Sequence, residues 1–307
     1  MSLMRSLLLA ASQNTWLRDH AANYKFVRRS ASRFMPGETL EEALAAAQLL
    51  SKKKIGTVFT RLGENISDRG EATKVTDHYV QVLDRVAAAR LSAEISVKLT
   101  QLGLDLSPEF CFENLLKIIA RAPKDSIVWV DMEASNYVDP TLEIYTRALQ
   151  AHPNVGICLQ AYLFRTKDDV ARLLPLKPSI RLVKGAYSEP PEIAYPRKAD
   201  VDERYFVLAQ EMLAAAKDGR CVRAAFGTHD AQLIRRITDF AASQGIALSD
   251  VEIQMLFGIQ RVEQERLAAA GHRSMVLIGY GSYWYPWFVR RLAERPANVW
   301  FLLKNLF

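Results

Sequence analysis

The stretch from residue 127 to residue 162 reads IVWVDMEASNYVDPTLEIYTRALQAHPNVGICLQAY. A β-rich run at Ile127–Glu133 is followed by a helical pattern at Thr141–Ala151 and by a second β-rich run at Val155–Tyr162. Continuous apolar strands joined through a helix are typical of a parallel sheet that helices cover. This stretch therefore predicts an α/β fold.

The same alternation extends in both directions along the chain. Helical patterns at Thr76–Arg90, Tyr205–Lys217 and Ala231–Gln244 lie between further β-rich runs. Eight such alternations favour a (β/α)8 barrel over an open doubly wound sheet. The eight expected strands are Gly56–Leu62, Glu94–Leu99, Ile127–Glu133, Val155–Tyr162, Ile180–Tyr187, Cys221–Thr228, Val251–Phe257 and Met275–Tyr280.

The chain before the first expected strand has a different pattern. Residues 1–50 look helical, with a break at Pro36–Thr39. Thr39 is expected to cap a helix at Leu40–Leu50, and Glu42 completes the capping box. We expect an N-terminal helical extension at residues 1–50, followed by a catalytic barrel at residues 51–307.

The composition is that of a globular, basic protein. Half of the 307 residues are hydrophobic (50%), and the formal charge of +6 comes from lysines and arginines spread along the chain. This diffuse charge could favour an anionic cofactor, an acidic substrate or a membrane surface, but it does not indicate nucleic acid. No signal peptide or stretch of ~18 uncharged apolar residues is evident. Three cysteines are expected to be buried thiols of a reducing compartment: Cys111, Cys158 and Cys221.

Polar residues gather where the expected strands end. In a (β/α)8 barrel the carboxyl ends of the strands form the active site. Burying charge there is costly unless the charges are paired or bind something, so their convergence indicates a functional site. These residues are Glu64, Lys98, Asp131, Glu133, Gln160, Arg181, Lys184, Thr228, His229 and Gln254.

Several roles are open for these residues. Lys98 or Lys184 could form a Schiff base with a carbonyl substrate, or either could be an ion-pair partner. Asp131 and Glu133 lie on one side of an expected strand and could bind a metal. No second histidine lies near His229 in sequence, so a metal site is not expected.

The last expected helix carries two adjacent arginines. Pro286 suits its first turn, and Pro296 should end it near Arg295. Arg290 and Arg291, behind an aromatic run, could clamp one carboxylate, or they could belong to an ordinary solvated helix face.

The chain contains several long motifs in the order in which they occur in the monofunctional proline dehydrogenases, and it resembles this family. These enzymes are flavoenzymes of proline catabolism. The resemblance extends from Leu62 to the C-terminus. It rests on Val97–Gly103, Val130–Glu133, Arg181–Tyr187, Phe226–His229, Glu252–Gly258 and Trp284–Pro296.

The resemblance implies a distorted (β/α)8 barrel that holds non-covalent FAD at its carboxyl-terminal face. Such enzymes oxidise L-proline to Δ1-pyrroline-5-carboxylate and pass the electrons to a membrane quinone. The product would go to a separate pyrroline-5-carboxylate dehydrogenase. A cytoplasmic protein, with possible peripheral attachment to the inner face of the membrane, is the simplest expectation.

The resemblance also implies a role for each matching residue. The catalytic pair near substrate and flavin would be Asp131 and Arg181. Substrate-binding residues would be Lys98, Tyr187, Leu256, Leu277, Trp287, Arg290 and Arg291, with Glu64 as the ion-pair partner of Arg290. FAD-binding residues would be Met132, Gln160, Lys184, Gly185, Ala186, Thr228 and His229.

Two substrate-binding positions depart from the family pattern. Leu277 and Trp287 stand where members commonly carry tyrosine, and Tyr280 cannot be assumed to replace the first of these. The lost hydroxyl and added space at Leu277 could admit 4-hydroxyproline. A hydroxyproline-oxidising relative is therefore one competing hypothesis. Two others are a Schiff-base or phosphate-binding lyase that uses Lys98 or Lys184 without flavin, and a catalytically silent barrel whose charge of +6 binds a partner or a membrane surface.

Overall fold

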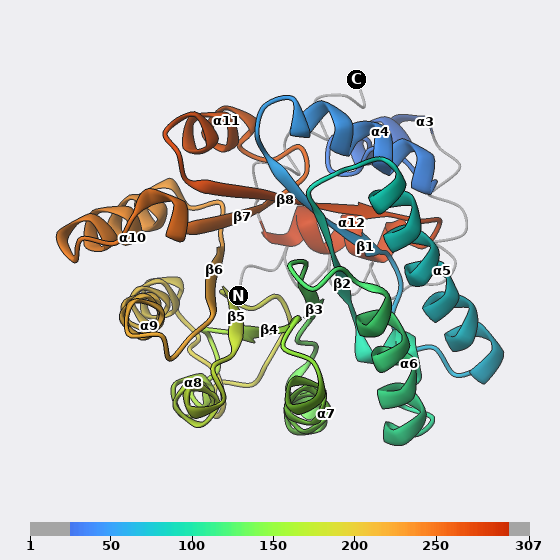
Figure 1. The fold of residues 1–307 in the computed structure, drawn as a ribbon, viewed down its shortest axis with the longest axis horizontal. Coiled ribbons are helices and arrows are strands. Elements are labelled where there is room, and N and C mark those ends of the chain that lie inside the picture. Colours follow the sequence, from blue (N-terminus) through green and yellow to red (C-terminus); the bar gives the residue numbers. More distant parts are fainter. Residues whose placement is uncertain (1–24, 295–307) are drawn as a thin grey trace.

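The computed structural model describes residues 25–294, and this part of the chain forms a closed barrel of parallel strands in sequential order (Figure 1). The first strand, β1, pairs with β8 over six residues, from Gly56 with Met275 to Arg61 with Tyr280. The strands are β1 (Gly56–Arg61), β2 (Ala93–Val97), β3 (Val128–Val130), β4 (Val155–Gln160), β5 (Ser179–Val183), β6 (Arg223–Gly227), β7 (Glu252–Leu256) and β8 (Arg273–Tyr280). The predicted barrel is confirmed.

Most strands end before the residue at which the sequence pattern placed their end. β3 ends at Val130 instead of Glu133, and β5 ends at Val183 instead of Tyr187. The loop residues that follow a strand can be as buried as the strand itself, as Met132 after β3 and Ala161 after β4 are. Their apolar character therefore looks like a continuation of the strand.

Helices follow the strands and surround the barrel (Figure 1). Those of the described chain are α3 (Lys25–Ala31), α4 (Leu40–Ser51), α5 (Arg69–Ala88), α6 (Pro108–Arg121), α7 (Val138–Ala151), α8 (Thr166–Leu173), α9 (Lys198–Lys217), α10 (Ala231–Ser243), α11 (Arg261–Ala269) and α12 (Trp284–Glu294). Short 3-10 turns lie at η1 (Leu99–Leu102), η2 (Ser135–Tyr137), η3 (Leu174–Leu176) and η4 (Leu248–Asp250). None of these helices has the length and apolar character needed to cross a membrane.

The capping of α4 follows the sequence prediction. The Thr39 hydroxyl accepts a hydrogen bond from the Glu42 backbone N–H, and the Glu42 carboxylate accepts one from the Thr39 backbone N–H. The inner face of α4, including Ala43 and Ala47, belongs to the same buried cluster as Phe59 of β1. Helix α4 thus covers the outer wall of the barrel where β1 and β8 meet.

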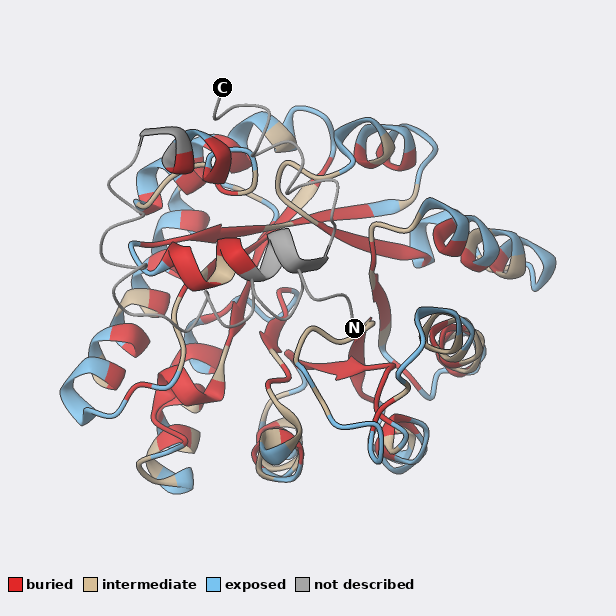
Figure 2. Cartoon of the chain, turned by 180° about the vertical axis from the view of Figure 1, so that it is seen from behind, coloured by how far each residue is buried: buried red, intermediate tan, exposed pale blue. Residues whose placement is uncertain are grey.

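Helix α12 takes a different place from the outer helices. It begins at Trp284, so Pro286 lies in its first turn as predicted, and it continues to Glu294, the last described residue. Phe288 and Val289 pack with Ala31 of α3 and with Leu62, which directly follows β1. Helix α12 therefore lies near the carboxyl end of β1, and both ribbon views show it across the middle of the barrel (Figures 1 and 2).

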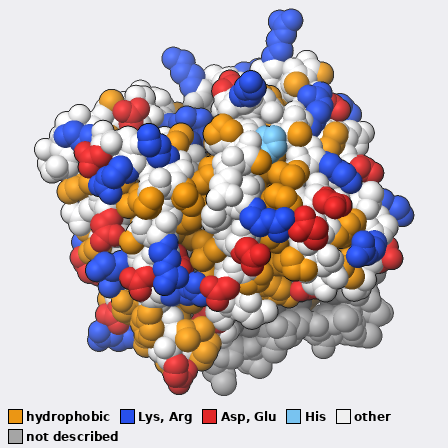
Figure 3. All heavy atoms as spheres, turned by 60° about the horizontal axis from the view of Figure 1, so that its bottom comes forward, with side chains coloured by type: hydrophobic (Ala, Val, Ile, Leu, Met, Phe, Trp, Pro, Cys, Tyr) orange, Lys and Arg blue, Asp and Glu red, His pale blue; other side chains and the backbone are white. Residues whose placement is uncertain are grey.

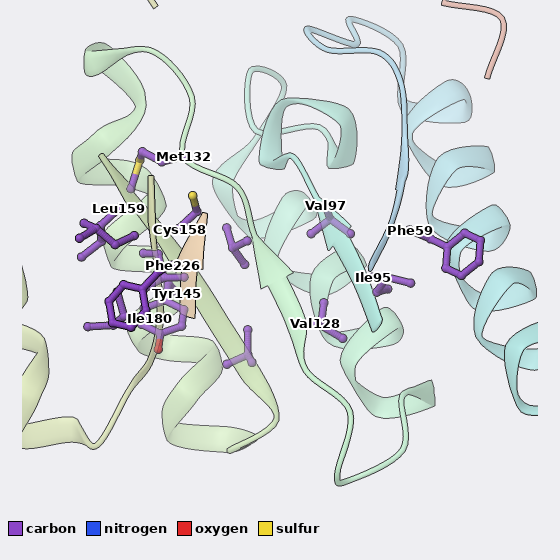
Figure 4. Packing of buried hydrophobic residues seen from close by; sticks show 14 of the residues in the cluster. Phe59, Ile95, Val97, Val128, Met132, Tyr145, Cys158, Leu159, Ile180 and Phe226 are labelled. Atoms are coloured by element: carbon purple, nitrogen blue, oxygen red, sulfur yellow. The ribbon is translucent and has the colours of Figure 1, made fainter. Parts of the chain in front are cut away.

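Side chains alternate between the outside and the inside of the barrel wall. Outward residues such as Ile95, Val128 and Ile180 form the main core against the helices (Figure 4). Inward residues such as Val58 and Trp129 form a smaller cluster inside the barrel. The strands are buried along most of their length, whereas the helices are buried on one face (Figure 2).

The three cysteines are buried and free, as expected. Positive and negative side chains are interspersed over the face in Figure 3, in keeping with the diffuse charge of the sequence.

Candidate active site

Two predicted catalytic residues, one just after β3 and one within β5, meet inside the barrel. Asp131 directly follows β3, where its backbone N–H donates to the Val97 carbonyl at 2.9 Å. Arg181 lies in the middle of β5, points inward and is 3% exposed. Its Nη2 donates to the Asp131 carboxylate and, at 2.8 Å, to the Ser96 hydroxyl. The predicted pair is thus in direct contact.

The charges at this site stabilise each other. Burial alone would raise the pKa of Asp131, but Arg181 and Lys98 outweigh burial and hold that pKa below its ordinary value. The Ser96 hydroxyl also donates to Asp131, at 2.9 Å. Asp131 is therefore a carboxylate at neutral pH.

Lys98 completes the charged group at the barrel mouth. Its Nζ lies 3.4 Å from Asp131 Oδ2, and its side chain is 15% exposed. Burial lowers the pKa of Lys98, but Asp131 and Glu133 outweigh burial and raise it above its ordinary value. A Schiff-base lysine needs a neutral amine, so this environment argues against the lyase hypothesis for Lys98.

Glu133 does not share the surroundings of Asp131. Because β3 ends at Val130, the alternation of a strand does not extend to either carboxylate. Glu133 accepts hydrogen bonds from the backbone N–H of Thr100 at 3.2 Å and from its hydroxyl at 2.7 Å. Burial raises the pKa of Glu133 to about 6. The described residues contain no group of three or more histidine, cysteine and acidic side chains that could hold a metal ion.

Gln160, at the end of β4, offers an acceptor to a ligand. Its Nε2 donates to the backbone carbonyl of Glu133 at 3.1 Å and approaches that of Met132 at 3.4 Å. Its Oε1 is buried and has no hydrogen-bond partner among the described residues. Buried acceptors are seldom left unsatisfied, so this atom fits a ligand donor.

The turn after β5 depends on a glycine. Gly185 has a φ of +115°, and a Cβ atom at this position would lie 2.3 Å from the Tyr162 ring. Lys184 Nζ contacts Asp202 Oδ1 at 2.5 Å and Asp230 Oδ2 at 3.0 Å. Only glycine suits this backbone. The next residue, Ala186, is half-exposed in the loop that follows the carboxyl end of β5.

The loop after β6 is held by local hydrogen bonds. The hydroxyl of buried Thr228 accepts from the backbone N–H of Asp230 at 3.2 Å. His229 Nε2 accepts from the backbone N–H of Leu256 at 2.9 Å, so this nitrogen is unprotonated. The geometry thus links a predicted FAD-binding residue to a predicted wall of the substrate pocket.

Leu256 and Leu277 lie side by side at the inner wall. They are partners in the pairing of β7 with β8, and both are partly exposed. Tyr280, by contrast, is 1% exposed and packs outward against Phe59, with its hydroxyl 2.8 Å from His78 Nε2. Tyr280 therefore does not take the place of the tyrosine that family members commonly carry at position 277, and the caution drawn from the sequence was justified.

Other predicted residues lie in the loops after the strands and in α12. Glu64 and Tyr187 are half-buried in the loops after β1 and β5. Trp287, in α12, packs against the buried cluster that Phe288 and Val289 form with Ala31 and Leu62. The side chains of Arg290 and Arg291 lie outside the described residues, although their backbone belongs to α12. Their clamp remains a prediction.

Of two residues that contact Arg181, sequence reasoning missed Ser96 and placed Gln254 among the strand-end polar residues without a specific role. Ser96 donates to Asp131 and accepts from Arg181, and Gln254 Oε1 accepts from Arg181 Nη1 at 3.2 Å. Ser96 lies two residues before Lys98, so the alternation along β2 could have placed it on the inner face. A small hydroxyl inside an apolar strand gives little other signal.

Comparisons with known proteins identify relatives of the whole chain. The family model described as proline dehydrogenase matches residues 43–304. The chain is 35% identical over 305 residues to proline dehydrogenase 1 of Bacillus subtilis (strain 168), covering 99% of each chain. It is 37% identical over 282 residues to the proline dehydrogenase of Deinococcus radiodurans, covering 90% of this chain and 89% of the relative.

A solved structure shows the same fold. Proline utilization A from Bdellovibrio bacteriovorus, inactivated by N-propargylglycine, matches with a TM-score of 0.81 and 24% identity. The match covers 95% of this chain and 36% of that longer protein. Since the family model spans most of the chain and relatives above 30% identity span nearly all of it, the chain belongs to the proline dehydrogenase family of oxidoreductases.

Proposed function

We propose that this protein oxidises L-proline to Δ1-pyrroline-5-carboxylate with non-covalently bound FAD. The observation that carries the proposal is the pair of buried Arg181 and partly buried Asp131, with Lys98 beside it, in a chain of this family. The three side chains carry a net positive charge, which suits an anionic substrate and a cofactor that gains negative charge on reduction.

The described residues fit a flavin. The buried Gln160 Oε1 needs a hydrogen-bond donor, and Gly185 lets the turn after β5 pack against the Tyr162 ring, where any other residue would collide with it. Met132, Lys184, Ala186, Thr228 and His229 surround this region in the proposal. A bound flavin supplies the hydride acceptor, which no amino-acid side chain can provide.

The chain's own residues bind and orient proline. Arg290 and Arg291 hold the carboxylate in the proposal, and Glu64 orients Arg290. Lys98 and Asp131 fix the charge around the substrate, while Leu256 and Leu277 exclude water from the ring. Tyr187 and Trp287 complete the pocket wall. The proline nitrogen must be neutral before its neighbouring carbon can lose hydride, so a proton leaves the amine first.

The proposed partners follow from this reaction. The electrons pass to a membrane quinone, and a separate pyrroline-5-carboxylate dehydrogenase consumes the product. A cytoplasmic protein with reversible contact to the inner membrane face fits a quinone acceptor, and the net charge of +6 favours anionic lipid.

Oxidation of 4-hydroxyproline is a second candidate activity. Leu277 is partly exposed on the inner wall and brings no hydroxyl to the pocket. A ring substituent would therefore meet an apolar side chain with space beside it.

Anaerobic mixing of the purified protein with each amino acid tests both activities. Bleaching of the flavin absorbance by L-proline would support the proposal, and the relative rate with trans-4-hydroxy-L-proline would rank the substrates. Bound flavin that neither amino acid bleaches would contradict the substrate. Protein that holds no flavin after reconstitution with FAD would contradict the cofactor and leave the lyase and the silent barrel as the surviving hypotheses.

A further inference from the structure

A row of buried polar side chains leads from Arg181 through the barrel interior, away from the proposed reaction site. Arg181 Nη1 donates to Gln254 Oε1 at 3.2 Å, and Gln254 Nε2 donates to Glu252 Oε1 at 2.6 Å. Arg223 Nη2 donates to the same Glu252 oxygen at 2.8 Å. The row thus connects the catalytic arginine to the amino-terminal end of the barrel.

The far end of this row is a compact charged cluster. Arg223 also contacts Glu94, which accepts from the indole N–H of Trp129 at 2.8 Å. Arg273, 45% exposed, approaches Glu252 at 3.3 Å and Glu94 at 3.7 Å. Two arginines and two glutamates balance each other here, so no net charge is left to attract a ligand.

The order of donors and acceptors fixes the orientation of Gln254. An arginine can only donate, and a carboxylate can only accept, whereas an amide has one end of each kind. Glu252 binds the amide nitrogen of Gln254 and thereby turns the amide oxygen toward Arg181. Gln254 and Glu252 are 3% and 1% exposed, so water does not compete for these bonds.

Trp129 supports the same arrangement from inside the barrel. The guanidinium carbon of Arg181 lies 5.2 Å from its ring centre, and that of Arg223 lies 5.3 Å from it. Arg181 is therefore held on one side by Asp131 and Ser96 and on the other by Gln254 and the indole.

We infer that Gln254 and Glu252 are positioning residues for Arg181. Gln254 sets the direction of the guanidinium, and Glu252 acts through Gln254. The inference rests on the proposed function, in which Arg181 stabilises charge that develops during hydride transfer. A small displacement of Arg181 would then slow the reaction and make the flavin harder to reduce, without removing the positive charge.

The central test compares Gln254→Met, Glu252→Gln and the double variant Glu252→Gln/Gln254→Glu. The methionine cannot accept a strong hydrogen bond, and Glu252→Gln leaves the amide of Gln254 free to turn around. In the double variant, the carboxylate at position 254 accepts from both Arg181 and the new amide at position 252, and the oxygen of that amide accepts from Arg223. The exchange keeps the net charge and restores the donor–acceptor order from position 252 to Arg181, although the single amide oxygen at position 252 replaces only one of the two carboxylate oxygens that accept from Arg223.

The control is Arg273→Gln, which removes a charge that lies 3.3 Å from Glu252 but leaves the hydrogen bonds from Glu252 through Gln254 to Arg181 in place. We expect the single variants to retain FAD and to lower the rate of flavin reduction by proline about 10- to 100-fold. We also expect the equilibrium constant for flavin reduction to fall about tenfold in the single variants. This corresponds to a midpoint potential lower by about 30 mV for a two-electron couple. The double variant should recover most of the rate, and the control should stay within about twofold of wild type.

The outcomes separate this inference from the proposed function. If proline does not bleach the wild-type flavin, the proposed function fails. If wild type is bleached but Gln254→Met and Glu252→Gln keep its rate and potential, the positioning role is wrong. An Arg273→Gln variant as slow as the single variants would also overturn it, because the cluster would then act by its charge. Should Gln254→Met not fold, Glu252→Gln and the double variant still distinguish these outcomes.

Discussion

Lys98 is a cation throughout the ordinary working range of an enzyme, because its pKa is raised by Asp131 and Glu133 against the effect of burial. A group that keeps its proton cannot produce a pH-dependent step near neutral pH. We therefore expect a pH-dependent step in flavin reduction to come from the amine of bound proline and not from Lys98.

The first prediction concerns that step. We expect the rate of flavin reduction by proline to rise with pH and then level off. In Lys98→Met the rate should fall about tenfold or more, because a cation is lost, and the step should remain but move to higher pH, because a positive charge that disfavours the protonated amine is gone. Stopped-flow absorbance over a pH series measures both. Lys98→Arg is the control that keeps the charge; a step that vanishes in Lys98→Met would assign it to Lys98 instead.

A second prediction concerns substrate choice at Leu277. Leu277→Tyr fills space on the inner wall, so we expect the ratio of kcat/KM for proline over trans-4-hydroxy-L-proline to rise about tenfold. Tyr280→Phe is the matched control, since that side chain faces outward and its hydroxyl contacts His78. An unchanged ratio in Leu277→Tyr would show that this residue does not set the specificity.

The sequence was sufficient for residues whose chemistry is unusual in a strand. Charged residues at strand ends indicated Asp131, Lys98 and Arg181, and the structure brings these three together. It was not sufficient for Ser96 and Gln254, because their roles depend on which side chain of another strand lies opposite. That information comes from the register of β2, β5 and β7 around the barrel, which no local pattern contains.

At the scale of elements, both described helices of the N-terminal segment, α3 and α4, pack against the rest of the structure. Helix α4 packs on the outer wall, and α3 packs with α12 and Leu62 near the carboxyl end of β1. The capping box of α4 was readable from four consecutive positions, because a cap is local. The packing of α3 and α12 was not, because an amphipathic helix does not specify its partner. We propose that residues 25–50 of the extension are a structural part of the barrel.

A third prediction tests one contact between these elements. Gly258, just after β7, has a φ of +79°, and a Cβ atom there would lie 1.5 Å from the Arg33 carbonyl oxygen, just after α3. Gly258→Ala should lower the free energy of unfolding by about 3 kcal/mol or more, because the added Cβ atom would force the backbone at Arg33 or at position 258 to move. The control Gly245→Ala shares a positive φ of +67° but meets no atom within 4 Å, and should cost only about 1 kcal/mol. Urea unfolding measures both; equal losses would show that the contact with Arg33 yields easily.

At the scale of the whole molecule, buried carboxylates make stability depend on pH in opposite directions. Asp131 has a lowered pKa, so its contribution is present above its unfolded pKa and is lost as the pH falls through the folded value. Glu133 has a raised pKa, so its contribution is complete below its unfolded pKa, near 4.5, and is lost as the pH rises through about 6.

The fourth prediction follows from Glu133. Its shift corresponds to about 2 kcal/mol of unfolding free energy that disappears between the unfolded and folded pKa values. Glu133→Gln should remove this part of the pH dependence while keeping an acceptor for Thr100. The control Glu113→Gln changes an exposed position on α6 and should retain the wild-type slope. Urea unfolding at a series of pH values decides; a wild-type slope in Glu133→Gln would show that Glu133 stays charged in the folded protein.

The pairing of β1 with β8 has a consequence for biosynthesis. While the chain leaves the ribosome, β1 emerges first among the strands, and its partner on one side emerges last. Until then β1 exposes an unpaired backbone edge, which can pair with another nascent chain. Helix α4 emerges before β1 and packs where the seam will form. Helix α4 can therefore cover the apolar outer face of β1 during translation. The surface of β1 that a chaperone would still need to cover is its unpaired backbone edge.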